Sequence, residues 1–174
     1  MAVDFHIDDD SAGRRPAPTH MATDSTHRLH HAVPSWVGDG AVFHIRVRIA
    51  PDYHESLTEP RLAKALLKSA AYYHEMSRWY CHLLLLMPDH LHALLSFPAD
   101  INMIMALGRW KAWQRRTLGI DWQVNFFDHR IRNNPEFELK AHYIRQNPVV
   151  KGLCATPDSW PWVLDVRSLD SRTA

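Results

Sequence analysis

The sequence predicts an α+β fold built on one antiparallel sheet. Three features lead to this prediction. Apolar and polar residues alternate strictly over residues 41–49, apolar residues recur with helical spacing over residues 62–76, and two apolar runs flank a Met-Pro-Asp segment at 87–89. A chain of 174 residues is long enough for one domain with a sizeable core.

The first elements expected along the chain are a strand and a helix. In "AVFHIRVRI", residues 41–49, every second residue is apolar, which is the pattern of a half-buried strand. The polar face of this strand carries His44, Arg46 and Arg48. Thr58 is the expected N-cap of the helix, which has Pro60 in its first turn and is expected to continue to about residue 76.

A hairpin, a second helix, a further strand and a last helix are expected next. "WYCHLLLLM" and "HLHALLSF" are the two strands of the hairpin, and residues 101–117 are expected to be helical. "DWQVNFFDHRI" is rich in aromatic and branched residues, which favours a strand or an extended segment. Asn134 and Pro135 are the expected N-cap and first-turn proline of the last helix, which we expect to end near Pro148.

This order of elements is the split βαβ, ferredoxin-like pattern with an appended C-terminal helix. It predicts helices on one face of the sheet and a more open second face. We assign residues 36–165 to this single domain. Residues 1–35 are expected to form a largely disordered N-terminal tail, because their polar composition cannot offset the entropy of ordering, and residues 166–174 a C-terminal tail.

Composition limits the classes of protein that the chain can represent. The net charge of +1 excludes a polycation, so any nucleic-acid binding requires a local basic patch. Two cysteines are too few for a disulfide framework. No apolar stretch is long enough to cross a bilayer, and the N-terminus has no apolar signal-peptide region, so we expect a soluble intracellular protein.

Two histidines lie one residue apart in the otherwise apolar run "LLLLMPDHLHALLSF". On a strand, His90 and His92 point to the same face about 7 Å apart, while Leu91 points into the core. Two neighbouring imidazoles can bind one metal ion. Two sheet histidines that are hydrogen-bonded to water or to carbonyls would give the same pattern, and the pair alone does not distinguish these alternatives.

The last helix carries a tyrosine and a carboxamide beside its buried stripe. Phe137, Ala141 and Ile144 form the stripe that we expect to be buried. Tyr143 and Asn147 are stacked on the neighbouring stripe, one helical turn apart. A tyrosine at the edge of the core and an asparagine C-cap would explain these two residues equally well.

Taken together, the motifs "MPDHLHALL" and, about fifty residues later, "YIRQNPVVKGL" resemble those of the REP-associated tyrosine transposases. These are relatives of the IS200/IS605 Y1 transposases and belong to the HUH endonucleases. "FHIRVRI", "WQVNFFDHRIR" and "SWPW" are also similar to segments of that family. The resemblance covers approximately residues 28–163.

The resemblance implies a role for each matching residue. His90 and His92 match the metal-ligating histidines, Tyr143 matches the nucleophile, and Asn147 stands where relatives place a carboxamide ligand, often glutamine. The implied reaction uses Mg²⁺ or Mn²⁺ to assist attack of the tyrosine on a DNA phosphate. This attack forms a 5′-phosphotyrosine that a 3′-hydroxyl can later resolve.

The segment "FFDHR" matches a recurrent motif of the family, so Asp128 and His129 are possible supporting residues of the active site. For His129 we favour a structural role, in which it orients the last helix.

The implied partner is single-stranded DNA that contains a hairpin or palindrome. Basic and aromatic side chains that could bind it are interleaved on the second helix, where we expect Trp113 to lie in the core in register with Met105. The residues of this candidate DNA surface are Arg109, Trp110, Lys111, Arg115 and Arg116. Arg46 and Arg48 on the first strand form a second candidate surface. A helix with solvated charges, and a strand face that is simply polar, are the respective alternatives.

We further expect a monomer or homodimer in the cytoplasm, associated with the nucleoid and not with a membrane. Two other functions remain open. The fold can serve a catalytically inactive DNA- or RNA-binding module. The histidine pair can also belong to an unrelated metal hydrolase, for which Asp89 is the only adjacent carboxylate.

Overall fold

The computed structural model describes residues 40–165. The predicted tails, residues 1–35 and 166–174, lie outside the described residues. Five strands form one antiparallel sheet in the order β4-β1-β3-β2-β5, and three α-helices pack on it. The elements are β1 (Val42–Arg48), α1 (Pro60–Glu75), β2 (Tyr80–Leu86), β3 (His90–Ser96), α2 (Met103–Leu118), β4 (Phe127–Arg130), α3 (Asn134–Val150) and β5 (Val163–Asp165), with a 3₁₀ turn at Pro157–Ser159.

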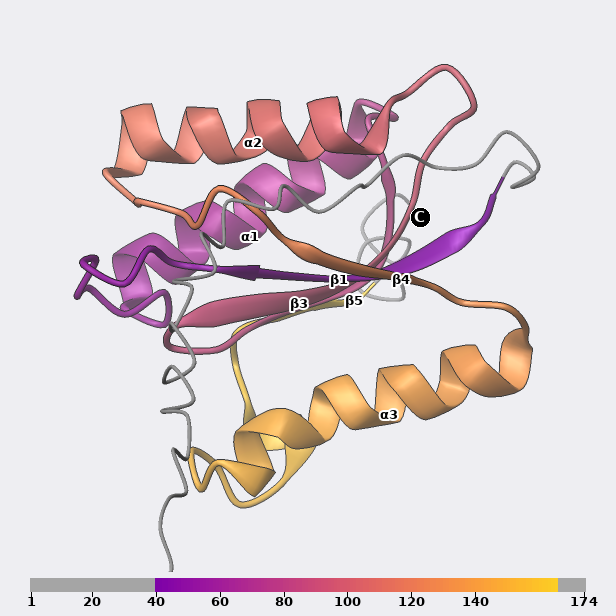
Figure 1. Ribbon diagram of the computed structural model, residues 1–174. Coiled ribbons are helices and arrows are strands. Elements are labelled where there is room, and N and C mark those ends of the chain that lie inside the picture. The colour runs from indigo at the N-terminus through magenta and orange to yellow at the C-terminus, as the bar shows by residue number, and fades with distance from the viewer. Residues whose placement is uncertain (1–39, 166–174) are drawn as a thin grey trace, which may run out of the picture.

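The sheet confirms the predicted fold class. The order β4-β1-β3-β2 is that of the split βαβ pattern, and β5 pairs with β2 at its free edge. Helices α1 and α2 lie on one face of the sheet and α3 on the other (Figure 1). The second face is therefore less open than predicted. The reason is that Ala141 and Ile144 of α3 are buried against this face.

The face beneath α1 and α2 carries the main hydrophobic core. Alternate residues of the strands point into it, including Ile45, Leu84 and Leu91. Trp110 of α2 is 1% exposed, and its indole Nε1–H donates to the Ser69 hydroxyl of α1 at 3.0 Å. The two helices and the sheet thus share one apolar layer.

The face beneath α3 has a smaller core, made of residues that alternate with the first set. Leu83, Leu85 and Leu94 point into it from the sheet, and Ile144 packs on them from α3. Trp160 closes this core, and its Nε1–H donates to the Leu86 carbonyl at 2.9 Å. Polar side chains occupy the rest of the face, where β1 and β3 pair.

The helix boundaries differ from the predicted ones by a residue or two. Glu59, not Thr58, is the N-cap of α1 and accepts from the Leu62 N–H at 3.0 Å. Asn133, not Asn134, is the N-cap of α3. Helix α3 also continues past Pro148 to Val150. The Pro148 ring is buried, so packing stabilises this last turn although proline supplies no backbone donor.

The predicted register of α2 was wrong. Trp113 was expected in the core with Met105, but these side chains are 39% and 54% exposed. The buried stripe instead passes through Met103, Leu107, Trp110 and Gln114. Both registers place a tryptophan on an apolar stripe, so the sequence pattern did not separate them.

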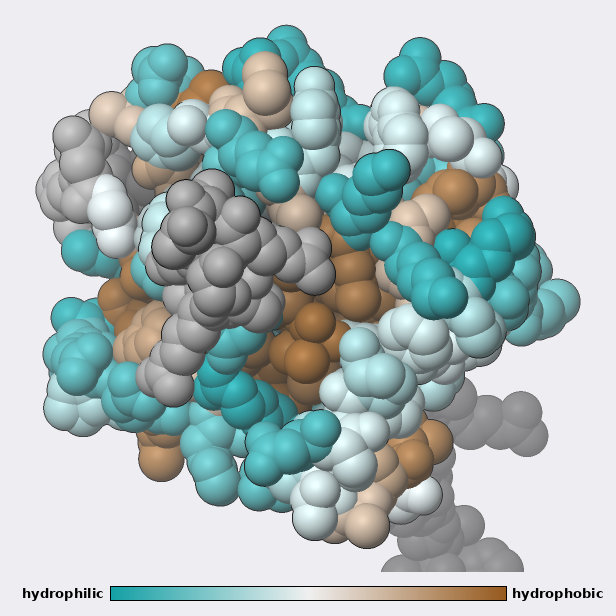
Figure 2. Space-filling model, turned by 180° about the vertical axis from the view of Figure 1, so that it is seen from behind, coloured by the Kyte–Doolittle hydropathy of each residue, from teal (hydrophilic) through white to brown (hydrophobic). Residues whose placement is uncertain are grey.

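None of the helices in residues 40–165 is long and apolar enough to cross a bilayer. Figure 2 shows hydrophobic residues near the middle of the face opposite to that of Figure 1, with hydrophilic residues around them.

Candidate functional site

The two histidines share one face of the sheet, as predicted, and α3 covers this face. In the register of β1 with β3, Arg46 is opposite His92 and Arg48 is opposite His90. Both imidazoles are buried, at 9% and 2% exposure, and their Nε2 atoms approach to 3.2 Å. The two rings therefore converge on one point.

Each ring of the pair has a different partner at its other nitrogen. Nδ1 of His90 lies 2.6 Å from a carboxylate oxygen of Asp89. Nδ1 of His92 lies 3.0 Å from Nε2 of His44, a buried residue of β1. The His44 and His92 rings also stack, with centroids 5.2 Å apart and planes inclined by 18°. Three imidazoles and one carboxylate thus form a continuous chain of polar contacts.

Burial keeps these imidazoles neutral at physiological pH. It lowers the pKa of His92 to about 3, and the neighbouring imidazoles and the cations of Arg46 and Lys140 act in the same direction. Burial likewise lowers the pKa of His44 to about 4. The pKa of His90 is lowered by burial and partly restored by Asp89. Neutral imidazoles keep the lone pair that a metal ion requires.

Tyr143 of α3 stands beside the pair. Its ring lies edge-on to His92, with centroids 6.0 Å apart and planes at 82°, and it is 50% exposed. The ammonium group of Lys140, one helical turn earlier, lies 5.2 Å from the centroid of the Tyr143 ring. The predicted nucleophile and the histidine pair therefore meet in one place, although they come from distant parts of the chain.

Asn147, the third predicted ligand, is oriented differently. Its Nδ2 donates to the Tyr143 carbonyl at 2.8 Å, which turns the side chain back on its own helix. Within residues 40–165, no cluster of three His, Cys, Asp or Glu side chains could hold a metal ion. His44 does not complete such a set, because it contacts the outer nitrogen of His92 rather than the point on which the two Nε2 atoms converge.

The donor atoms nevertheless fit a divalent cation. Two neutral imidazoles present adjacent Nε2 atoms, and each has a polar partner at Nδ1, as ligating histidines do. With these two protein ligands, an ion would keep positions for water and for substrate oxygens, as ions in catalytic metal sites do.

A hydrogen bond and an ion pair attach α3 to the sheet on either side of Tyr143. Nε2 of His129 lies 2.7 Å from Glu136 in the first turn of α3, the contact expected of a residue that orients this helix. Arg145 pairs with Asp165 of β5. Asp128 does not join the histidines. In the register of β1 with β4 it stands opposite Ile45, and residues opposite each other in a sheet point to the same face. The Ile45 side chain points into the main core, on the face of the sheet away from the histidines.

The residues predicted to bind DNA separate into two groups. Arg46 and Arg48 lie on the same face as the histidine pair. The guanidinium of Arg46 stands 5.6 Å from the Phe127 ring centroid, and Arg48 donates to Asp89 at 2.7 Å.

The α2 residues lie on the other side of the sheet, far from this face (Figure 1). Trp110 is a core residue, so its assignment to the candidate DNA surface was wrong. The Lys111 ammonium donates to the carbonyls of Gln123 and Val124, and burial lowers its pKa to about 8. Arg115 pairs with Asp121 at 3.5 Å. Arg116 is exposed, and Arg109 lines a shallow pocket between α1 and α2.

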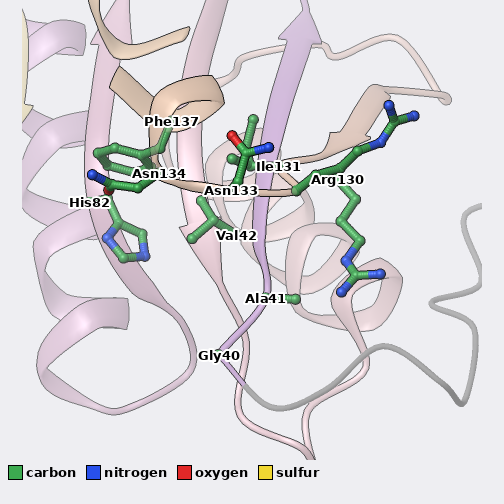
Figure 3. A pocket seen from close by; sticks show the side chains of 10 residues that line it. Gly40, Ala41, Val42, His82, Arg130, Ile131, Asn133, Asn134 and Phe137 are labelled. Atoms are coloured by element: carbon green, nitrogen blue, oxygen red, sulfur yellow. The ribbon is translucent and has the colours of Figure 1, made fainter. Parts of the chain in front are cut away.

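A pocket of about 510 Å³ opens where α3 begins (Figure 3). Its walls come from β1, β2, β4 and α3, and the rings of His82 and Phe137 meet edge to face on one side with centroids 5.5 Å apart. The lining residues are Gly40, Ala41, Val42, His82, Arg130, Ile131, Arg132, Asn133, Asn134 and Phe137.

Sequence reasoning missed His44 and Lys140 as members of the site. His44 was assigned to the polar face of β1, but only the pairing of β1 with β3 places it next to His92. Lys140 could have been found, because residues three apart on a helix are neighbours and Tyr143 had been singled out.

Comparison with known proteins supports the resemblance seen in the sequence. No family model matches the chain. The chain is 26% identical over 93 residues to the REP-associated tyrosine transposase of Escherichia coli (strain K12), a match that covers 51% of this chain. The match covers 52% of the relative, so this chain spans about half of the relative's length.

A solved structure, the REP-associated tyrosine transposase bound to a REP hairpin, has the same fold. The TM-score is 0.65 at 19% identity, and the match covers 83% of this chain and 88% of the solved one. The predicted resemblance to this family and the predicted fold class are thus confirmed.

Proposed function

We propose that this chain is a transposase-type nuclease that binds hairpin-containing DNA, cuts a single strand and rejoins it, with Tyr143 as the nucleophile. The observation that carries the proposal is the meeting of an exposed phenol with a convergent histidine pair. The Tyr143 ring stands against His92, whose Nε2 is 3.2 Å from that of His90.

Mg²⁺ or Mn²⁺ would be held by the Nε2 atoms of His90 and His92. The Asn147 oxygen is the remaining candidate ligand, because its Nδ2 is already used in the bond to the Tyr143 carbonyl. When bound, such an ion polarises the scissile phosphate and offsets the charge that develops during attack. Asp89 holds the proton of His90 at Nδ1 and so leaves Nε2 free to ligate.

Tyr143 attacks phosphorus through its phenolic oxygen and gives up its phenolic proton to solvent. The new P–O bond to the tyrosine replaces the bond to the 3′ oxygen, which leaves as a hydroxyl after taking up a proton. The phosphodiester energy is kept in the 5′-phosphotyrosine, so a second 3′-hydroxyl can reverse the step and join two strands.

Three cations face this site and would bind phosphates. Arg46 and Arg48 project from β1 opposite the histidines, and Lys140 projects from α3 beside Tyr143. Because the net charge of the chain is only +1, DNA binding requires a local basic patch, and these cations provide one. The similarity to a protein solved with a REP hairpin supports a hairpin as the substrate.

A covalent-adduct assay tests the proposal. The protein is incubated with Mn²⁺ and a labelled single strand that contains a hairpin, and denaturing electrophoresis detects DNA attached to protein. We expect an adduct with the natural chain and none with Tyr143→Phe, which removes only the attacking oxygen. Tyr72→Phe is the matched control, because Tyr72 is 56% exposed on α1, on the other face of the sheet.

Each outcome separates the candidate functions. Hairpin binding without an adduct in the natural chain would indicate the inactive binding module. An adduct that persists in Tyr143→Phe would contradict the assignment of the nucleophile.

A further inference from the structure

His44 is a buried histidine that the proposed chemistry does not use. It is 4% exposed, its Nε2 contacts Nδ1 of His92, and its own Nδ1 is buried without a hydrogen-bond partner among the described residues. Phe127 covers another side of the ring at a centroid distance of 5.7 Å. Burial of a ring nitrogen without a hydrogen-bond partner costs free energy, which suggests that His44 is retained for its contact with His92.

The contacts fix where the protons lie when no metal is bound. The Nδ1–H of His90 donates a hydrogen bond to Asp89, so its Nε2 bears a lone pair. The contact between the two Nε2 atoms therefore requires the proton on Nε2 of His92. Nδ1 of His92 then accepts from the Nε2–H of His44. The three neutral rings point their protons in one direction, toward Asp89.

Metal binding requires two of these three rings, those of His92 and His44, to change tautomer. Both Nε2 atoms of the pair must then offer lone pairs, so His92 must carry its proton on Nδ1. That proton needs an acceptor, and Nε2 of His44 is the atom within reach. His44 in turn carries its proton on Nδ1. Both rings change tautomer through exchange with solvent, and the chain releases no net proton.

We infer that His44 is a positioning residue that accepts the Nδ1 proton of His92 when the ion is bound and so holds this ligand in its metal-binding tautomer and orientation. This inference rests on the proposed function. The two ligands thus have different outer partners: a carboxylate for His90 and a neutral imidazole for His92. A ring serves His92 in both states, because it can donate from Nε2 without metal and accept at Nε2 with metal.

The binding test uses the full chain and Mn²⁺, with free Mn²⁺ followed by electron paramagnetic resonance. His44→Phe keeps an aromatic ring, slightly larger than imidazole, and removes the acceptor, and we expect it to weaken Mn²⁺ binding about 10- to 100-fold. His44→Gln places an amide oxygen near the former Nε2 position and should restore most of the affinity. His82→Phe is the matched control, since His82 bonds Ser96 at 2.8 Å on the same face of the sheet. It should leave the affinity unchanged.

Nitrogen-15 NMR of the natural chain tests the tautomers without any substitution, with diamagnetic Zn²⁺ as the probe. We expect the protons of His44 and His92 on Nε2 without metal and on Nδ1 with Zn²⁺. A His44 ring that keeps its Nε2 proton in the Zn²⁺-bound chain would overturn the inference, whether or not His44→Phe folds.

Metal-binding measurements on variants distinguish the role of His44 from the existence of the metal site. Mn²⁺ binding that is lost in His92→Ala but unchanged in His44→Phe overturns only the role of His44. A natural chain that binds neither Mn²⁺ nor Zn²⁺ removes the metal site itself, and the role of His44 with it.

Discussion

The two faces of the sheet are made of alternate residues of the same strands, yet they differ in chemistry. Beneath α1 and α2, inward-pointing strand residues such as Ile45, Leu84 and Leu91 are fully buried and apolar. Beneath α3, the leucines of β2 give way to imidazoles and guanidinium groups along β1 and β3. The comparison separates a face that stabilises the fold from a face that presents reactive groups.

Burying polar side chains on the α3 face costs free energy of desolvation, and the contacts on that face show how this cost is offset. Buried imidazoles lose hydration, and the molecule replaces it with a chain of hydrogen bonds that ends at Asp89. Helix α3 covers this face but leaves Tyr143 half exposed, so a polymer substrate could reach the phenol.

Truncation in the apolar face should cost the most stability. Trp110→Ala removes a buried indole and the bond to Ser69, so we expect the free energy of unfolding in urea to fall by about 3–5 kcal/mol. Trp113→Ala, three residues away and 39% exposed, is the control and should cost less than about 1 kcal/mol. Equal losses for the two tryptophans would contradict the observed register of α2.

Acid should destabilise the metal-free protein through the polar face. The pKa values of His44 and His92 are about 4 and 3 in the folded chain, against an ordinary value of 6.5. Burial is the main cause, and Arg46, Lys140, His90 and His129 add to it. Below pH 6.5 the unfolded chain therefore takes up protons that the folded chain refuses, and stability falls as the pH falls.

Between pH 6.5 and 5.5 the two rings together should lower the free energy of unfolding by about 2 kcal/mol. Urea titrations at several pH values in the presence of a chelator measure this slope. The double variant His44→Phe/His92→Phe should show a flatter dependence, and an unchanged slope would contradict the burial of neutral rings.

The cations of the polar face should contribute to DNA binding, while an exposed cation of α2 should not. In a Tyr143→Phe background, we expect Arg46→Ala to weaken binding to a hairpin-containing strand by about fivefold to tenfold. The slope of log affinity against log salt should fall by about 0.7, as for one lost phosphate contact on a single strand. Arg116→Ala is the control. A similar loss in both variants would move the DNA surface to α2.

The attachment of α3 should affect activity more than stability. Arg145→Gln breaks the partly exposed pair with Asp165, so we expect a loss of less than about 1 kcal/mol in the free energy of unfolding. The rate of adduct formation should fall by about twofold to fivefold, because Tyr143 is less well positioned. Arg61→Gln breaks the exposed pair with Glu55 and should leave the rate unchanged, and a lower rate there would refute this assignment.

Local patterns were sufficient for the main elements of the fold. The strict alternation over residues 41–49 predicted both β1 and the side on which His44, Arg46 and Arg48 lie. The spacing of His90 and His92 predicted that they share a face. Strand β5 was missed, since three residues are too short to show a period and pairing with β2 alone defines it.

The site was less predictable than the fold because its contacts join distant segments. Nothing near His44 in the sequence indicates that its ring meets His92, 48 residues away. The orientation of Asn147 depends on competition between its own helix and the site, and the spacing of residues does not decide it. Trp110 and Trp113 show the same limit, because a stripe of aromatic residues does not tell which one the sheet covers.

The most direct measurement is the location of the covalent bond to DNA. After reaction of the natural chain with Mn²⁺ and a hairpin-containing strand, nuclease and trypsin digestion leave short peptides for mass spectrometry. Trypsin cuts after Lys140 and Arg145, so Tyr143 is the only tyrosine of the peptide Ala-His-Tyr-Ile-Arg. We predict a nucleotide phosphate on this peptide. A nucleotide on the peptide that carries Tyr72 and Tyr73, or no modified peptide at all, would contradict the placing of the chemistry on the α3 face.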